Sequence, residues 1–279
     1  MAYGYLVLAV IVAATLTSGN RLLRSAGTIL VAAGLAMIAA SIVLANLDGT
    51  FAGHAAQATG LEAWTPAILN VQAGLAIVAV PFLIWAAWVQ WQRRAVTTPG
   101  ALNGTTGFGQ ISRLLHWSTA TLMLIMIPMG LFVSVLPAAS VERPMFLAAH
   151  QSLGMTILLL VALRLVWLLV SPAPPLPSTL TQWEHRLARV SHIGLYALIL
   201  GFPLSGYLLT TAQGQGTDLF GWVLGPVFAP DARIARIASL LHNLALPFIF
   251  YAVILAHVGA VLKHHFGQGR KDDVRRMLA

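Results

Sequence analysis

Long apolar runs alternate with short polar segments along the whole chain. A helix needs about 20 apolar residues to cross a bilayer, and seven runs approach this length: residues 2–19, 27–47, 66–91, 111–136, 145–170, 190–212 and 239–265. The repeated apolar–polar alternation over about 10 residues that is typical of a membrane β-barrel is missing. The pattern therefore predicts an all-α membrane protein with seven transmembrane helices.

The first run is short enough to be considered as a secretory signal peptide. However, no basic residue precedes it and no A-x-A cleavage site ends it, whereas Arg21 and Arg24 follow it directly. We therefore expect a retained helix whose N-terminus lies outside.

Composition supports the membrane class. Hydrophobic residues make up 58% of the 279 residues and charged residues only 9%, compared with about 25% charged residues in soluble domains. The net charge of +8 does not indicate nucleic-acid binding, because the basic residues lie at the ends of apolar runs, which predicts contact with membrane lipid. The absence of cysteine excludes disulfides, iron–sulfur clusters and covalent haem attachment.

The basic residues predict the orientation. One side of the predicted membrane carries only Arg143, Arg233 and Arg236, and Arg164 lies within the fifth run near the opposite side. That opposite side carries Arg21, Arg24, Arg93, Arg94, Arg113, Arg186, Arg189, Lys263, Arg270, Lys271, Arg275 and Arg276. Because basic loops stay in the cytoplasm, we expect the N-terminus outside and the C-terminus inside, on the cytoplasmic side.

Two polar segments indicate the organisation of the chain. Residues 96–110, VTTPGALNGTTGFGQ, contain Thr-x-Pro-Gly and Asn-Gly turn signals. They predict a linker between a three-helix module, residues 1–95, and a four-helix domain, residues 111–279. A second segment at 171–179, SPAPPLPST, is typical of a stiff, extended connection.

The nine histidines are the main candidates for chemistry, because histidine inside a membrane helix is a functional-site hypothesis by default. His116 and His257 lie at similar depth near the inner side, and His150 and His242 lie at similar depth near the outer side. Facing imidazoles in a helical bundle suit a noncovalent, low-spin haem b with both axial positions filled. On the last helix, 15 residues separate two of these histidines, which places two haem levels about 22 Å apart.

Further residues are candidates for cofactor binding. Gly154 follows His150 by four residues, on the same helix face, and leaves room for a porphyrin. Arg164 and Arg113 lie at the depth where the inner haem needs cations for its propionates. His192 could compete with His116 as a ligand or line a quinone pocket.

Other interpretations of the histidines remain. Zinc is a competing metal, although two-histidine sites without a nearby carboxylate or thiolate are poor zinc sites. The histidines near the water interface are more simply explained as interfacial or packing residues: His54, His185, His264 and His265.

Residues 108–279 resemble the bacterial cytochrome b561 family, which includes superoxide oxidase and is related to the b-type cytochrome subunits of nickel–iron hydrogenases and formate dehydrogenases. The resemblance covers about 60% of the chain. It is carried by FGQISRLLHW at 108–117, AHQSLGMTILLLVALRLVW at 149–167, SPAPPLP at 171–177, RVSHIGLYALILGFPLSGYLL at 189–209, LLHN at 240–243 and LAHVGAVLKHHF at 255–266. The first 95 residues lie outside it.

The resemblance implies two b haems, one between His116 and His257 and the other between His150 and His242. The family usually has one residue fewer between its two histidines on the last helix, and one extra residue rotates His257 by about 100°. Pro247 lies between the two, and a proline kink or π-bulge can absorb an added residue. We therefore predict an irregularity near 243–248.

The resemblance also implies a function. Electrons would pass from superoxide, which is oxidised to O₂ outside, through both haems to ubiquinone, with His192 and His264 as possible proton relays. The second hypothesis is a haem-containing membrane anchor and electron conduit for a partner dehydrogenase or a periplasmic redox protein, which would dock at the inner loops or at the 213–239 loop. A non-redox transporter or sensor is the third.

Overall fold

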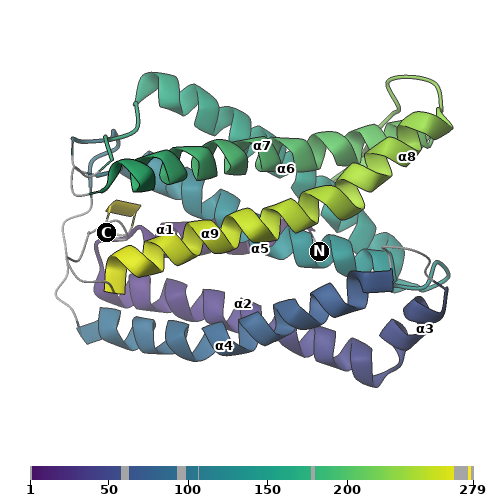
Figure 1. The fold of residues 1–279 in the computed structure, drawn as a ribbon, viewed down its shortest axis with the longest axis horizontal. Helices are drawn as coiled ribbons and strands as arrows, with labels where there is room; N and C mark the ends of the chain where they lie inside the picture. The colour runs from purple at the N-terminus through teal and green to yellow at the C-terminus, as the bar shows by residue number, and fades with distance from the viewer. Residues whose placement is uncertain are drawn as a thin grey trace.

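The computed structural model describes residues 2–57, 63–92, 99–105, 107–176, 180–266 and 276–277. Figure 1 shows long helices lying side by side, with α2 and α4 along one side of the bundle and α6 and α7 along the other. The elements in chain order are α1 (Ala2–Leu16), α2 (Arg21–Leu47), α3 (Thr50–Gln57), α4 (Thr65–Gln92), α5 (Gln110–Val135), α6 (Glu142–Val170), α7 (Gln182–Ala212), β1 (Thr217–Leu219), β2 (Trp222–Leu224), α8 (Ala232–Leu240), the π-helical turn η2 (Leu241–Ala245) and α9 (Leu246–Phe266).

Within these described residues, six helical stretches are long and apolar enough to cross a membrane: α2, α4, α5, α6, α7 and the continuous stretch Ala232–Lys263. Helix α1 has 15 residues and is therefore only about 22 Å long. The predicted all-α membrane fold is confirmed, with one of the seven expected helices shorter than the others.

Local sequence signals define several helix ends. Asn20 accepts a hydrogen bond from the Leu22 N–H and begins α2. Thr181 and Glu184 form a reciprocal capping box at the start of α7. Such caps satisfy N–H groups that have no partner within the helix. Because of these caps, α2 and α7 begin six and eight residues before the apolar runs predicted at 27–47 and 190–212.

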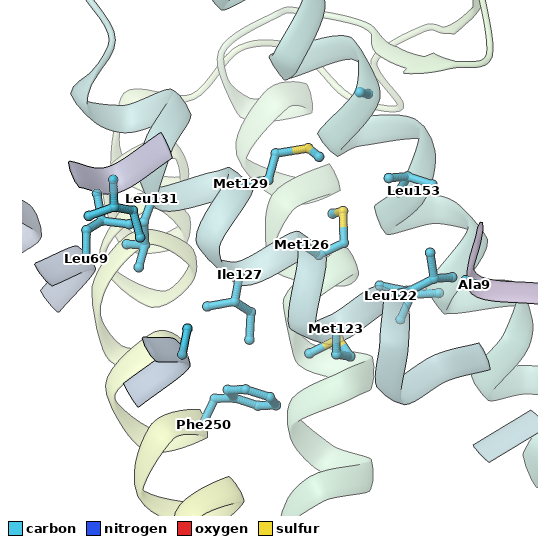
Figure 2. Packing of buried hydrophobic residues seen from close by; sticks show 14 of the residues in the cluster. Ala9, Leu69, Leu122, Met123, Met126, Ile127, Met129, Leu131, Leu153 and Phe250 are labelled. Carbon is cyan, nitrogen blue, oxygen red and sulfur yellow. The ribbon is translucent and has the colours of Figure 1, made fainter. Parts of the chain in front are cut away.

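The N-terminal helices contact the rest of the bundle in two ways. Helices α2 and α4 pack along each other, and α1 packs against α5 more extensively than against α2. Figure 2 shows Ala9 of α1 beside Leu122 of α5, and Leu69 of α4 beside Leu131 of α5. These residues belong to one continuous hydrophobic core. The division at residues 96–110 stays a prediction.

A β-hairpin follows α7, within the 213–239 loop where a partner protein was expected to dock under the second hypothesis. Strands β1 and β2 pair antiparallel. Both turn residues have positive φ, 56° at Phe220 and 92° at Gly221, as a two-residue type I′ turn requires. Ser152 of α6 donates to the Asp218 carboxylate at 2.8 Å and accepts from the Phe220 N–H at 2.9 Å. Tyr3 of α1 packs on Phe220 with ring centroids 4.7 Å apart.

The predicted irregularity in the last helix is confirmed. A π-helical turn occupies Leu241–Ala245, where the Leu246 N–H donates to the Leu241 carbonyl. It overlaps the predicted range of 243–248 and ends just before Pro247, which has no N–H to continue the α-helical ladder. A π-turn accommodates one additional residue, so the 15-residue interval between His242 and His257 keeps both histidines directed into the bundle.

The two ends of the bundle carry different elements. The hairpin end carries β1–β2, α8 and the start of α6. The basic end carries the starts of α2, α5 and α7 and the end of α9. At the basic end, Asn103 joins the loop before α5 to the loop after α6. Its side chain donates to the carbonyls of Ser171 and Pro172 and accepts from the Gly109 N–H and the Ser112 hydroxyl.

Candidate functional site

The hairpin end brings two of the predicted histidines close together. His150 on α6 and His242 on the π-turn have ring centroids 5.9 Å apart and ring planes at 85°. Two imidazoles on opposite sides of one metal ion have centres about 6 Å apart, given metal–nitrogen bonds of about 2 Å and the half-width of each ring. The spacing therefore suits two axial ligands of one iron.

Hydrogen bonds fix the tautomer of His242. Its Nδ1 lies 3.0 Å from the Phe202 carbonyl oxygen and 3.0 Å from Ser205 Oγ. The Ser205 hydroxyl donates its own proton to the same carbonyl. Nδ1 therefore carries the proton, and Nε2 keeps a free lone pair. Histidine ligands of metal ions are typically held in this way, with the second nitrogen donating to a carbonyl.

Each ring of this pair rests against a glycine of a neighbouring helix. A Cβ at Gly130 of α5 would lie 2.7 Å from Cε1 of His150, and a Cβ at Gly206 of α7 would lie 2.9 Å from Cε1 of His242. Neither position has room for a larger residue while the rings stay in place. Both glycines therefore set the position of the two imidazoles.

Sequence reasoning missed these two glycines. In both helices the glycine follows an internal proline closely: Pro128 precedes Gly130, and Pro203 precedes Gly206. A proline and a glycine within one membrane helix are a signal of close approach to a neighbour. That signal was available in the sequence.

The surroundings of His150 differ from those of His242. The Met126 carbonyl lies near the His150 ring, but Nδ1 is buried and makes no full hydrogen bond to any of the described residues. Gly154, which was predicted to leave room beside the histidine, faces Met126, whose Cε would lie 3.7 Å from an added Cβ. This is an ordinary contact distance, so Gly154 is less confined than Gly130.

The basic end gathers one residue from each of four helices. His192 of α7 and His257 of α9 have ring centroids 5.5 Å apart at an angle of 61°. His116 of α5 lies within electrostatic range of both of these histidines and of Arg164 of α6. The predicted pair was His116 with His257, whereas the direct ring contact joins His257 to His192. Three imidazoles thus lie near one another where the sequence predicted two axial ligands.

Two arginines lie beside this cluster. The Arg164 guanidinium lies over the Tyr196 ring, 5.3 Å from its centroid. Arg113 is 6% exposed, and its Nε donates to the Phe108 carbonyl at 2.7 Å. Its Nη1 is buried and has no partner among the described residues. A buried cation with an unused N–H group favours an anion such as a carboxylate.

The side chain of His264, predicted as a possible proton relay, lies outside the described residues. Within the part of the chain that the structure describes, no group of three or more His, Asp or Glu is arranged to hold a metal ion.

Comparison with known proteins identifies the family. The family model described as prokaryotic cytochrome b561 matches residues 107–279. The chain belongs to this family. It is 33% identical over 179 residues to cytochrome b561 homolog 2 of Escherichia coli (strain K12), which covers 63% of this chain and 93% of the relative. It is 27% identical over 175 residues to cytochrome b561 homolog 1 of the same organism, covering 61% and 96%. It is also 28% identical over 124 residues to a probable superoxide oxidase CybB of Yersinia pestis, covering 44% and 70%.

Membership of the cytochrome b561 family makes this chain a multi-pass inner-membrane protein for b-haem electron transfer across the membrane. The residues present fit a haem. The hairpin-end imidazoles are spaced for one iron, and Nη1 of Arg113 lacks a partner among the described residues, as a cation beside a haem propionate would. The family match excludes α1–α4, yet these helices share the hydrophobic core of the family domain.

Proposed function

We propose that this cytochrome b561 transfers electrons from superoxide at the hairpin end to ubiquinone at the basic end through two b haems. The resemblance to a probable superoxide oxidase supports the donor. The excess of Lys and Arg at the basic end supports a cytoplasmic position for that end, which puts the hairpin end on the periplasmic side.

Four histidines would hold the haems: His150 with His242, and His116 with His257. When bound, haem supplies one-electron exchange at its iron. His242 and His257 are 15 residues apart on the last helix, so the two sets of ligands would lie about 22 Å apart. Arg113 would offset the negative charge of propionates at the basic end.

The oxidation half-reaction requires no acid, base or nucleophile from the protein. Each superoxide loses one electron and leaves as O₂, so two superoxide ions supply the two electrons that one quinone needs. The hairpin end carries Arg143, Arg233 and Arg236, of which Arg233 and Arg236 are exposed on α8. Positive charge near the entrance raises the encounter rate of a small anion.

The reduction half-reaction requires two protons, because quinone plus two electrons and two protons gives quinol. His192 is the candidate relay at the basic end, since its side chain is exposed and touches the ring of His257. His264 is a second candidate from the sequence. Histidine suits this role near neutral pH.

The observation that carries the proposal is the hairpin-end pair with its fixed tautomer and its two supporting glycines. A reduced-minus-oxidised spectrum of the purified protein, with haem quantified per chain, should give two b haems. His242→Ala should lose one haem, whereas His192→Ala should keep both and slow quinone reduction. A folded chain without haem would overturn the proposal, and loss of a haem in His192→Ala would overturn His116 as the partner of His257.

The donor is tested in vesicles that contain the purified protein and ubiquinone. Superoxide consumption coupled to quinol formation by this chain alone is expected. The alternative, a conduit for a partner redox protein, is favoured by the apolar side chains exposed at the hairpin end, Trp222 (80% exposed), Val223 (70%) and Val227 (69%). A chain with two haems that consumes no superoxide until a partner is added would establish the alternative.

A further inference from the structure

A polar contact within the membrane joins the N-terminal helices to the helix that carries two of the histidines. Gln72 of α4 is hydrogen-bonded to the phenol of Tyr251 of α9. Gln72 lies seven residues into α4, about 10 Å from the start of that helix. Polar groups at such a depth are costly unless they are paired, so this contact is a specific link between the two parts of the chain.

From Tyr251, a series of edge-on aromatic contacts leads to His242. The ring centroids are 5.9 Å apart for Tyr251 and Phe250, 6.0 Å for Phe250 and Phe202, and 6.1 Å for Phe202 and His242. The interplanar angles are 76°, 80° and 82°. Edge-to-face pairs contribute about 0.5–1.5 kcal/mol each beyond the burial of their area, so the position of each ring constrains the next.

Two features make the series rigid. Phe250, at its centre, is 4% exposed and belongs to the hydrophobic core. Phe202 touches His242 twice, through its ring and through its carbonyl, which accepts the Nδ1 proton. A shift of Phe202 therefore changes both the orientation of the imidazole and the hydrogen bond that sets its strength as a ligand.

We infer that Gln72 is a positioning residue for His242. It fixes Tyr251, and through Phe250 and Phe202 it sets the orientation of the imidazole and its Nδ1 hydrogen bond. The N-terminal helices, which the family match excludes, thereby tune the hairpin-end haem without touching it. The inference rests on one part of the proposed function, namely that His242 is a haem ligand.

The test uses the purified full-length protein with its haems. Gln72→Leu removes the amide and keeps a side chain of similar size. The potential and the low-spin electron paramagnetic resonance signal of the hairpin-end haem, assigned by its loss in His242→Ala, should shift, while the other haem and the haem content stay unchanged. Tyr251→Phe should cause the same shift. The double variant should show no further change, because both substitutions break one hydrogen bond.

A matched control lies on the same helix. Asn70 is hydrogen-bonded to Asn46 of α2, so Asn70→Leu removes a polar pair that does not involve α9. It should leave both haem signals unchanged. Unchanged signals in both Gln72→Leu and Tyr251→Phe would overturn the inference, and so would an equal shift in Asn70→Leu. If His242→Ala removes none of the haem signals of the wild-type protein, the proposed function is overturned as well.

Discussion

A single added methyl group at position 206 should disturb the hairpin-end histidine pair. In Gly206→Ala, the new Cβ would lie 2.9 Å from Cε1 of His242, 3.3 Å from Nδ1 and 3.4 Å from Nε2. Ordinary contacts begin at 3.4 Å, so the ring must move by about 0.5 Å, the difference between 3.4 and 2.9 Å. The ring cannot move away freely, because its Nδ1 is hydrogen-bonded to the Phe202 carbonyl at 3.0 Å.

This crowding sets the size of the expected loss of haem affinity. Overpacking of a well-packed site costs about 1–3 kcal/mol. Where this cost falls on the haem-bound form, in which the imidazole is held at both nitrogens, the dissociation constant of the haem rises about 5- to 150-fold. The second haem of the proposal would be held at the opposite end of the bundle and should bind normally. The variant is therefore expected to retain one haem per chain after dilution or detergent washing.

The assay is haem content per chain, combined with the low-spin resonance signals and with thermal unfolding to check the fold. Gly201→Ala is the matched control on the same helix, because its Cβ would meet Leu246 at 3.7 Å, an ordinary contact. It should bind two haems. If Gly206→Ala also keeps two haems with unchanged signals, the geometry described for His242 is wrong.

Three further outcomes follow. Asn103→Ala loses four side-chain hydrogen bonds and should lower the free energy of unfolding by about 2–4 kcal/mol, measured by denaturant titration; an unchanged midpoint would contradict it. Trp117→Phe loses the 3.0 Å bond from Nε1 to the Met277 carbonyl and should speed proteolysis of the C-terminal tail while haem content stays constant. Hydrogen bonds from the Thr50 side chain and backbone hold the pKa of Asp48 below its ordinary value. Its stabilisation is therefore present above the unfolded pKa and lost as pH falls through the folded pKa, so Asp48→Ala should melt lower than wild type at neutral pH and equally in strong acid.

Much of this architecture can be predicted from the amino-acid sequence alone. The apolar runs predicted the membrane helices to within a few residues in α4, α5 and α6. The interval between His242 and His257 is one residue longer than is usual in the family that the sequence resembles. With Pro247, this difference predicted a break in helical periodicity, and the π-turn at Leu241–Ala245 provides it. Depth along each helix placed His150 level with His242, because rise per residue is nearly constant in an α-helix.

Lateral packing could not be predicted in the same way. Depth gives the level of a side chain but not the direction in which it faces or its neighbour on another helix. For that reason the sequence paired His257 with His116, whereas the structure puts the ring of His192 against it. The contacts of Gly130 and Gly206 with the two hairpin-end rings likewise depend on how closely neighbouring helices approach.

The shortness of α1 has a consequence for the order in which the chain is assembled. At about 22 Å, α1 is shorter than the hydrocarbon core of about 30 Å, and its Tyr3 meets Phe220 of the hairpin, 217 residues away along the chain. Helix α1 is synthesised before the hairpin, and the hairpin that contacts its Tyr3 emerges only after α7. Helix α1, whose length is mismatched to the bilayer, therefore lacks the contact at its Tyr3 end until late in translation. The Tyr3–Phe220 contact closes one of the longest loops in the molecule, and contacts of such sequence separation form slowly.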